Sequence, residues 1–300
     1  MTERALKYSR STSFIIVLVG YVIAVAVGMM VIDMFREIYH PVITIGIADF
    51  AATVVIFVFS VRLKNSSMYD PYWSVIPPLI AIYFMWELPD GDLTRQLLIT
   101  SVTSFWAIRL TLNWAKGWPG LHHEDWRYGK LAEDTGKAYW AVSFSGIHLF
   151  PTIMVYLGCI PMYYAMASSN PLGIWDIIAA LVAVIATIIE YVSDEQLRKF
   201  KQSVSDGGSK IMDQGLWAYS RHPNYFGEVL FWCGIMIFSL GIDFQEYLWT
   251  GVGFLVMVIL FQFISIPMME NRHKAKRPEY QEYVKRVSRL VPWIPKDRVS

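Results

Sequence analysis

Long apolar runs alternate with short polar segments along almost the whole chain. A helix needs about 20 mostly apolar residues to cross a bilayer, and eight runs approach or reach that length. They are residues 14–32, 42–61, 72–86, 96–114, 142–165, 174–192, 226–240 and 247–266. The pattern predicts an all-α integral membrane protein with about eight transmembrane helices.

Proline interrupts two of these runs. The third is short and contains Pro77 and Pro78, and the fifth contains His148, Pro151 and Pro161. Because proline removes a backbone donor inside a helix, we expect the fifth span to be kinked or broken. The first run is too long for the apolar core of a cleavable signal peptide, so we expect it to be a span.

Basic residues are distributed very unevenly between the two sides that eight spans define. The loops on one side hold only Arg36 and Arg95, whereas the other side holds the remaining 24 lysines and arginines. Cytoplasmic loops of membrane proteins carry such an excess of positive charge. The distribution predicts that both termini and the long polar loops are cytoplasmic.

Composition excludes several classes of protein. The chain is 55% hydrophobic and only 17% charged, whereas soluble domains average about 25% charged residues. A soluble enzyme, a disordered chain and a nucleic-acid module are therefore not expected, and the net charge of +1 gives no bulk attraction to polyanions. Cys159 and Cys233 lie in apolar runs without metal-ligand spacing, so we expect free thiols and no metal site. With no repeat or linker visible, residues 1–300 are expected to form one polytopic domain.

Ionisable side chains inside spans are expensive to bury and are candidates for function. One reading is that they pair with one another and brace the bundle, for example Arg109 with Asp49 or with Glu228. The other reading is a functional site. The five such residues are Asp49, Arg109, His148, Glu190 and Glu228.

The densest polar cluster covers residues 215–228, at the cytoplasmic mouth of the seventh span. Pro223 disfavours helical backbone at His222, so we expect an irregular element there. Arginine can hold phosphate, asparagine can bind an amide, and aromatic rings can stack on a base. This chemistry suits a nucleotide cofactor that enters from the cytoplasm, although an ordinary loop with a snorkelling arginine is the plainer alternative. The chain has no glycine-rich nucleotide fingerprint, so the site would not be a Rossmann fold.

Further polar clusters fall on the same face, at residues 65–73, 124–128 and 193–200. The tail at residues 277–287 is amphipathic. Helical spacing places Tyr280, Tyr283, Val284, Val287 and Val291 on one face. We expect the tail to lie on the membrane surface or to fold under the bundle, where it would cover the cofactor mouth.

Together these clusters resemble the steroid 5-alpha-reductase-like family of membrane reductases, in particular its bacterial DUF1295 group. The matching segments are 65–77, Trp106 with Arg109-Leu110, 124–128, 193–194, 215–228, 266–270 and 277–280. The likeness places an extra N-terminal span at residues 1–41 and a reductase-like core at residues 42–295. It implies NADPH-dependent reduction of a carbon–carbon double bond in an enone-like or steroid-like lipid, in a bacterial inner membrane. Membrane lipid and a lipophilic substrate are the implied partners, with no nucleic acid.

The resemblance also implies which side chains bind NADPH. Asn224, Tyr225, Glu228 and Asp194 correspond to cofactor contacts of the family. Arg109 and Arg127 are similar to arginines of the fourth span and its loop, and other basic residues are expected to hold phosphate. The full predicted cofactor set is Arg109, Arg127, Tyr128, Asp194, Arg198, Lys201, Tyr219, Arg221, His222, Asn224, Tyr225, Glu228 and Arg272.

The proton donor is left open among four residues. Animal steroid reductases use a glutamate and a tyrosine, and the Glu-Leu-Pro sequence at Glu87 resembles the glutamate motif. The position that resembles their tyrosine is Trp106, which cannot donate a proton in the same way, and this argues against a strictly steroid substrate. The other candidates are Asp49, Asp70 and Tyr72, since burial would raise an aspartate pKa and make it a general acid.

Two other classes remain as alternatives. An S-adenosylmethionine-dependent membrane methyltransferase of the isoprenylcysteine or phospholipid type shares the Arg-His-Pro-x-Tyr-x-Gly pattern at residues 221–227 and a tyrosine-containing tail. It differs where Met269-Glu270 replaces a glutamate pair and where Glu228 follows Gly227. A transporter or scaffold is less favoured, because no repeat symmetry is visible.

Overall fold

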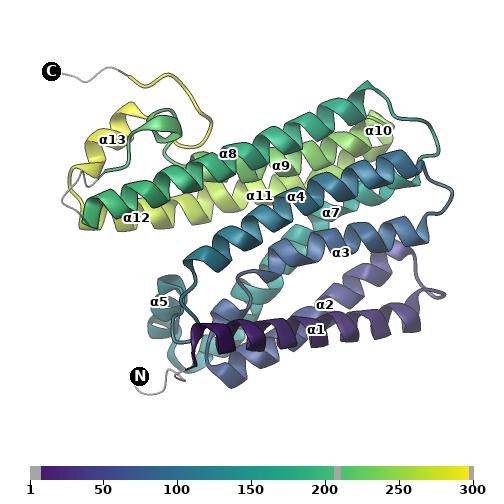
Figure 1. Cartoon of the computed structure of the whole chain (residues 1–300), viewed down its shortest axis with the longest axis horizontal. Helices are drawn as coiled ribbons and strands as arrows, with labels where there is room; N and C mark the ends of the chain where they lie inside the picture. Colours follow the sequence, from purple (N-terminus) through teal and green to yellow (C-terminus); the bar gives the residue numbers. More distant parts are fainter. Residues whose placement is uncertain (1–7, 206–210, 297–300) are drawn as a thin grey trace. The chain divides into compact units, whose positions relative to one another are not determined.

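The computed structural model describes residues 8–205 and 211–296, and these residues are helical almost throughout, with no β-strand among them. The chain forms two compact units, residues 1–171 and residues 172–300, and each is described separately (Figure 1).

The first unit consists of long helices joined by short capped turns. The side chain of Asp92 caps α4 by accepting a hydrogen bond from Arg95 N, and Asp125 caps α5 in the same way through Arg127 N. Such caps satisfy backbone donors that a helix start leaves without partners. The elements are α1 Arg10–Phe35, α2 Pro41–Leu63, η1 Ser66–Met68, α3 Tyr72–Glu87, α4 Leu93–Gly117, α5 Trp126–Thr135, η2 Gly136–Ala138, α6 Tyr139–Val142, the π-helix η3 Ser143–Leu149 and α7 Phe150–Ala167.

The second unit is built around two long helices, α8 and α9, which pack closely through small residues. Ala179, Ala183 and Ala186 are fully buried on α8 and face Gly227 and Gly234 of α9. The elements are α8 Ile174–Ser205, η4 Gly215–Ala218, α9 Pro223–Leu240, α10 Phe244–Tyr247, η5 Leu248–Gly251, α11 Val252–Leu260, the π-helix η6 Phe261–Ser265, α12 Ile266–Lys276 and α13 Tyr280–Arg286.

All eight apolar runs are helical, which confirms the all-helical class. Within the described residues, five helical stretches are long and apolar enough to cross a membrane. Helices α3, α4 and α9 are not among them, and α3 has only 16 residues. The count of eight crossings therefore stays a prediction. The five stretches are Arg10–Phe35, Pro41–Leu63, Trp126–Ala167, Ile174–Ser203 and Phe244–Lys276.

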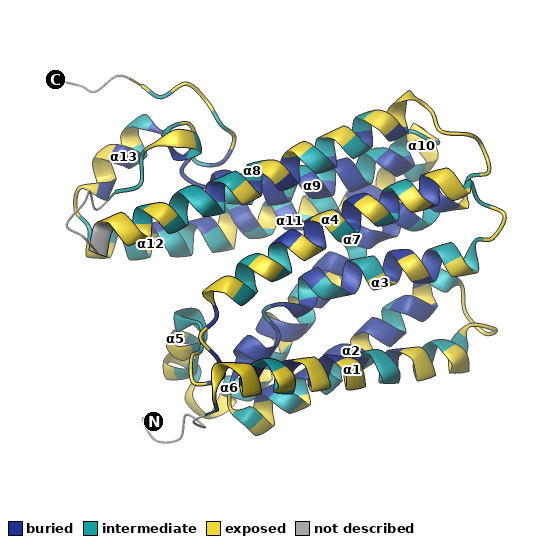
Figure 2. Cartoon of the chain, in the orientation of Figure 1, coloured by how far each residue is buried: buried dark blue, intermediate teal, exposed yellow. Residues whose placement is uncertain are grey.

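Exposed positions run along the outer surfaces of the helices (Figure 2), and many of the exposed side chains are large and apolar. On α1, for example, Leu18, Val22 and Met30 are 60–69% exposed. Large apolar side chains exposed in such numbers are expected where lipid, rather than water, is the solvent. The burial pattern therefore agrees with a membrane protein.

The predicted irregularity of the fifth run is confirmed. The π-helix Ser143–Leu149 precedes α7, and Pro161 lies inside α7. The π-helix turns His148 into the core, where Nε2 lies 3.0 Å from Ser60 Oγ and Nδ1 lies 3.0 Å from Ser143 O. His148 is thus a buried packing residue with both ring nitrogens partnered. The expected free thiols are also confirmed at Cys159 and Cys233.

Candidate functional site

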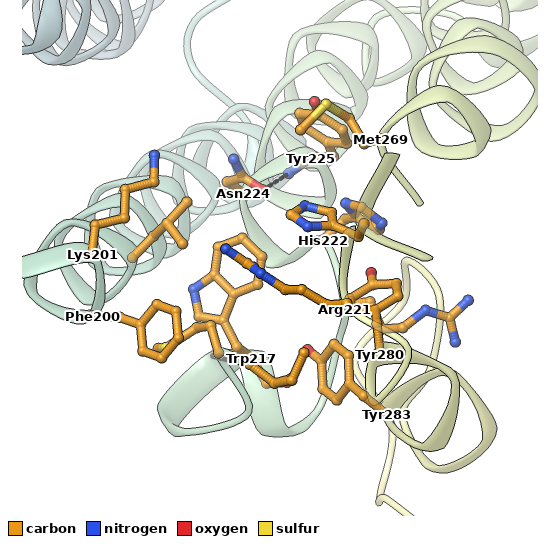
Figure 3. Close-up of a pocket in the computed structure, with 15 residues that line it drawn as sticks. Phe200, Lys201, Trp217, Arg221, His222, Asn224, Tyr225, Met269, Tyr280 and Tyr283 are labelled. Carbon is orange, nitrogen blue, oxygen red and sulfur yellow. Dashed lines mark hydrogen bonds between the residues drawn. The ribbon is translucent and has the colours of Figure 1, made fainter. Parts of the chain in front are cut away.

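The second unit contains a pocket of about 200 Å³ between the end of α8, the segment before α9, and helices α12 and α13 (Figure 3). Its charged lining residues are all basic, namely Lys201, Arg221 and Arg277. Aromatic rings and the amide of Asn224 form much of the remaining lining. The lining residues are Leu197, Phe200, Lys201, Ile211, Met212, Trp217, Arg221, His222, Asn224, Tyr225, Met269, His273, Arg277, Tyr280 and Tyr283.

The predicted irregular element before the seventh apolar run is present. Gly215 starts the 3₁₀ turn with φ of 59°, and a Cβ at this position would come 2.5 Å from Gln196 Nε2. His222 is the N-cap of α9 with non-helical backbone, and Pro223 occupies the first helical turn. Proline is well suited to that position because its missing N–H has no helical partner there. Pro223 therefore begins α9, and the backbone of His222 before it is non-helical, as expected.

Three aromatic rings form a stack at one wall of the pocket. The rings of His222 and Tyr225 are nearly parallel, with centroids 5.4 Å apart, and Tyr225 stacks on Phe261 at 4.6 Å. Asn224 points into the pocket beside Tyr225 in Figure 3, and its Nδ2 lies 3.4 Å from Asp194 Oδ1. The structure thus brings together Asp194, Asn224 and Tyr225, three of the residues predicted to contact the cofactor.

Arg221 is buried and holds the C-terminal tail against the bundle. Its Nε donates to Glu270 Oε1 at 2.8 Å, and its Nη1 donates to the carbonyls of Val284 and Val287 at 2.9 and 2.6 Å. His222 Nε2 lies 3.5 Å from the same Glu270 oxygen. Burial lowers the pKa of His222 below its usual value, although Glu270 opposes the shift. The imidazole is therefore neutral at pH 7 and is not a cation for phosphate.

The tail helix α13 closes one side of the pocket. Tyr280, Tyr283 and Val287 are buried together, and the Tyr283 hydroxyl donates to Trp217 O at 2.5 Å. Burial raises the pKa of both tyrosines, so they remain protonated donors. The predicted amphipathic helix is confirmed in this part, but Val291 is 58% exposed and does not share the buried face.

Some predicted cofactor residues of the second unit lie outside this pocket. Arg198 pairs with Glu195, and Glu228 accepts a hydrogen bond from Trp232 Nε1 at 2.9 Å. Tyr219 and Arg272 do not line the pocket. Conversely, sequence reasoning did not assign Trp217, His273 and Arg277 to the cofactor, although the Arg-Pro-x-Tyr pattern at residues 277–280 was already a visible signal.

The first unit brings two of the candidate acids into separate tyrosine pairs. Asp49 and Tyr72 are both buried, and the Tyr72 hydroxyl donates to Asp49 Oδ1 at 2.8 Å. The Tyr128 hydroxyl donates to Asp70 Oδ1 at 2.7 Å. Desolvation raises the pKa of Asp70 to about 7, against the opposing hydrogen bonds from Tyr128 and Ser67. Both pairs are suited to holding a proton.

The remaining first-unit candidates lie elsewhere. Glu87 is the last residue of α3 and Tyr72 is the first, so the helix, about 24 Å long, separates them. Arg127 forms a bidentate ion pair with Asp125, from Nε to Oδ1 at 2.8 Å and from Nη2 to Oδ2 at 3.1 Å. Arg109 is buried within α4. Arg109, Arg127 and Tyr128 thus belong to the first unit, and the other predicted cofactor residues belong to the second.

The helices and the pocket together define an α-helical membrane protein with a basic, aromatic site at its helix ends. The chain belongs to the family described as protein of unknown function DUF1295, whose model matches residues 56–287. This confirms the resemblance found from the sequence motifs. The match begins within α2, so α1 lies outside it.

Several relatives share parts of the sequence. An uncharacterised protein of Schizosaccharomyces pombe is 27% identical over 284 residues, which covers 86% of this chain and 82% of that protein. The 3-oxo-5-alpha-steroid 4-dehydrogenase 1 of Macaca fascicularis is 31% identical over 107 residues, and that of Homo sapiens is 30% identical over 107 residues. These two matches cover 36% of this chain and only 36% and 37% of the steroid enzymes. No solved structure matches the chain significantly.

Proposed function

We propose that this protein is a membrane-embedded reductase that uses NADPH to reduce a carbon–carbon double bond conjugated to a carbonyl in a lipophilic, steroid-like substrate. The observation that carries the proposal is the second-unit pocket, whose charged lining residues are all basic and lie among aromatic rings. The partial similarity to 3-oxo-5-alpha-steroid 4-dehydrogenases supports a reductase and does not favour the methyltransferase alternative.

The lining residues fit part of a phosphorylated dinucleotide. Lys201 and Arg277 supply positive charge for phosphate oxygens, the Asn224 amide can pair with a carboxamide or a base edge, and Trp217 offers a ring for stacking. Ligand pockets usually measure about 300–1,000 Å³, so a pocket of about 200 Å³ holds one end of the cofactor. Arg221, which is already bonded to Glu270 and two carbonyls, has the separate role of keeping the tail in place.

Bound NADPH would supply the hydride for the β-carbon and leave as NADP⁺. The protein must then stabilise negative charge on the carbonyl oxygen and deliver a proton to the α-carbon. We assign these roles to Tyr72 and Asp49. When Asp49 is protonated, its carboxyl O–H can donate to the Tyr72 oxygen, which frees the single phenol proton to donate to the developing oxyanion. Asp70 with Tyr128 is the second acid candidate, and Glu87 stays a prediction.

The proposed arrangement in the membrane follows the charge distribution. We propose eight spans, both termini in the cytoplasm of a bacterial cell, and a pocket that opens to the cytoplasm. We also propose that the two units belong to one polytopic domain, with residues 1–41 as the additional span and residues 42–295 as the reductase core. We also propose that the other residues assigned to the cofactor from the sequence contact NADPH.

NADPH binding to purified protein in nanodiscs tests the proposal. We expect the fluorescence of NADPH to change on binding, and binding to weaken about tenfold in Lys201→Ala, as for loss of one phosphate contact worth about 1.4 kcal/mol. Lys130→Ala, which removes an exposed lysine paired with Asp134 on α5, is the matched control and should bind normally. Folded protein that does not bind NADPH, or that transfers a labelled methyl group from S-adenosylmethionine to lipid, would contradict the proposal.

A further inference from the structure

The last described part of the C-terminal tail, residues 288–296 after α13, is held in one conformation by hydrogen bonds to the segment before α9. Arg221 N donates to Ser288 O at 2.8 Å, the Ser220 hydroxyl donates to Leu290 O at 2.7 Å, and Trp293 N donates to Tyr219 O at 2.9 Å. Lys296 N closes the tail back onto Arg286 O at 3.0 Å. The directions of its side chains are therefore fixed by the fold.

Those side chains divide into an inner and an outer set. Val287 and Leu290 are each only 5% exposed, whereas Val291, Trp293 and Ile294 are 58%, 72% and 78% exposed. Tyr219, which is 49% exposed, lies next to them, because Tyr219, Trp293 and Ile294 line one shallow groove. We call Tyr219, Val291, Trp293 and Ile294 the tail patch. Contiguous exposed apolar side chains of this size mark a contact surface.

Two features identify what the tail patch contacts. The first is charge: residues 288–296 contain two basic residues, Arg289 and Lys296, and no acidic residue. The second is position. Tyr219 is four residues before the first residue of α9, and nearby Trp217 Nε1 donates to Ser193 O at 3.1 Å, directly after the apolar run 174–192 of α8. A surface beside the end of a membrane helix meets the bilayer interface.

We propose that the tail patch is inserted into the headgroup region of the bilayer on the side where α9 begins, with the neighbouring basic residues facing anionic lipid headgroups. Tryptophan and tyrosine prefer this region because their rings are apolar at one end and polar at the other. Basic side chains near an anionic surface add attraction. The anchor would fix the tail that carries Tyr280 and Tyr283, and it does not depend on the proposed reductase activity.

Site-specific lipid quenching tests the proposal. Ile294→Cys is labelled with an environment-sensitive fluorophore in the full chain, reconstituted into nanodiscs of three parts phosphatidylcholine to one part phosphatidylglycerol. Nitroxide-labelled lipid should reduce its emission about twofold, as for a group buried in the interface. Glu282→Cys is the matched control, because its side chain on α13 is 70% exposed, and its emission should be almost unchanged. Unsubstituted protein gives the background from Cys159 and Cys233.

Val291→Cys provides a second position on the tail patch and should be quenched as well. Absence of quenching at both patch positions, or equal quenching at Glu282→Cys, overturns the proposal. Replacing phosphatidylglycerol with phosphatidylcholine should lessen the quenching at residue 294, and an unchanged signal would overturn the role given to the basic residues.

Discussion

At the scale of single residues, Arg221 shows why a residue's chemistry alone does not fix its role. The sequence predicts a phosphate ligand there, since arginine is the side chain best shaped for phosphate. In the folded chain its Nε and Nη1 bind Glu270 and two tail carbonyls. A charge that is removed from water requires such partners, but the partners lie 49 to 66 residues away in sequence. Only the fold could reveal them.

Arg221→Ala is expected to destabilise the second unit strongly. The substitution leaves the buried Glu270 carboxylate without its nearest cation, and loss of one partner of a buried pair costs about 3–5 kcal/mol. The apparent melting temperature in detergent should fall, and the tail should become sensitive to proteases. Arg286→Ala is the control, because its partly exposed pair with Asp213 at 3.6 Å contributes about 0–1 kcal/mol. Equal stability of the two variants would contradict this role.

Asp70 should make stability depend on pH in a direction opposite to that of a salt-bridged aspartate. Its pKa is about 7 in the folded chain and about 3.9 when unfolded, so the folded state holds the extra proton between these values. Stability therefore falls as the pH rises through this window. Relative to Asp70→Asn, the wild-type melting temperature should decrease from pH 5 to pH 8. Asp134→Asn, at an exposed position on α5, should keep the wild-type slope, and parallel curves for wild type and Asp70→Asn would refute the assignment.

At the scale of elements, the apolar runs predict where helices form. A helix satisfies its backbone hydrogen bonds within a single segment, as the bilayer requires, whereas strands would need to close into a barrel. All eight runs are helical, and the fifth run contains the expected irregularity, the π-helix η3. The second π-helix, at Phe261, and the exposure of Val291 were not predictable. Both depend on long-range contacts. Phe261 stacks on Tyr225, and the residues around Val291 are hydrogen-bonded to the segment before α9. The periodicity of apolar residues contains no information about such contacts.

Contact between α8 and α9 should depend on Gly234. A Cβ at this position would lie 2.9 Å from Ala183 N and 3.1 Å from Ala179 O, and backbone atoms cannot move aside as a flexible side chain can. Small residues permit this close approach in membrane helices. Gly234→Ala should therefore lower stability by about 1–3 kcal/mol, measured by thermal unfolding in detergent.

The matched control for this substitution is Gly129→Ala in α5, where an added Cβ meets no atom within 4 Å. It should leave stability unchanged or raise it by up to about 1 kcal/mol, because alanine favours helix. A Gly234→Ala variant as stable as this control would show that the two helices can separate without cost.

At the scale of the whole molecule, the predicted distribution of basic residues places the pocket and most of the positive charge on the same side of the membrane. The 24 basic residues assigned to one face include Lys201 and Arg277 of the pocket and four residues of the C-terminal tail, Lys285, Arg286, Arg289 and Lys296. Sequence alone could predict this partition, because translocation across the membrane disfavours basic loops. It could not predict that some basic residues line a pocket, that Arg221 is buried and bonded to tail carbonyls, and that others lie on the surface of the tail. That division arises only from packing.

The predicted sidedness can be measured with reporter fusions in a bacterial host. Alkaline phosphatase is active only outside the cytoplasm, whereas a cytoplasmic fluorescent protein matures only inside. With eight spans, phosphatase inserted at Asp90, in the turn between α3 and α4, should be active, and phosphatase at the C-terminus should be inactive. The fluorescent protein should give the reverse result. Phosphatase at Tyr39, between α1 and α2, serves as a second outside position and should match Asp90. Phosphatase activity at the C-terminus would refute the eight-span arrangement, because an odd number of crossings would then separate the pocket and the tail from the cytoplasm that supplies NADPH.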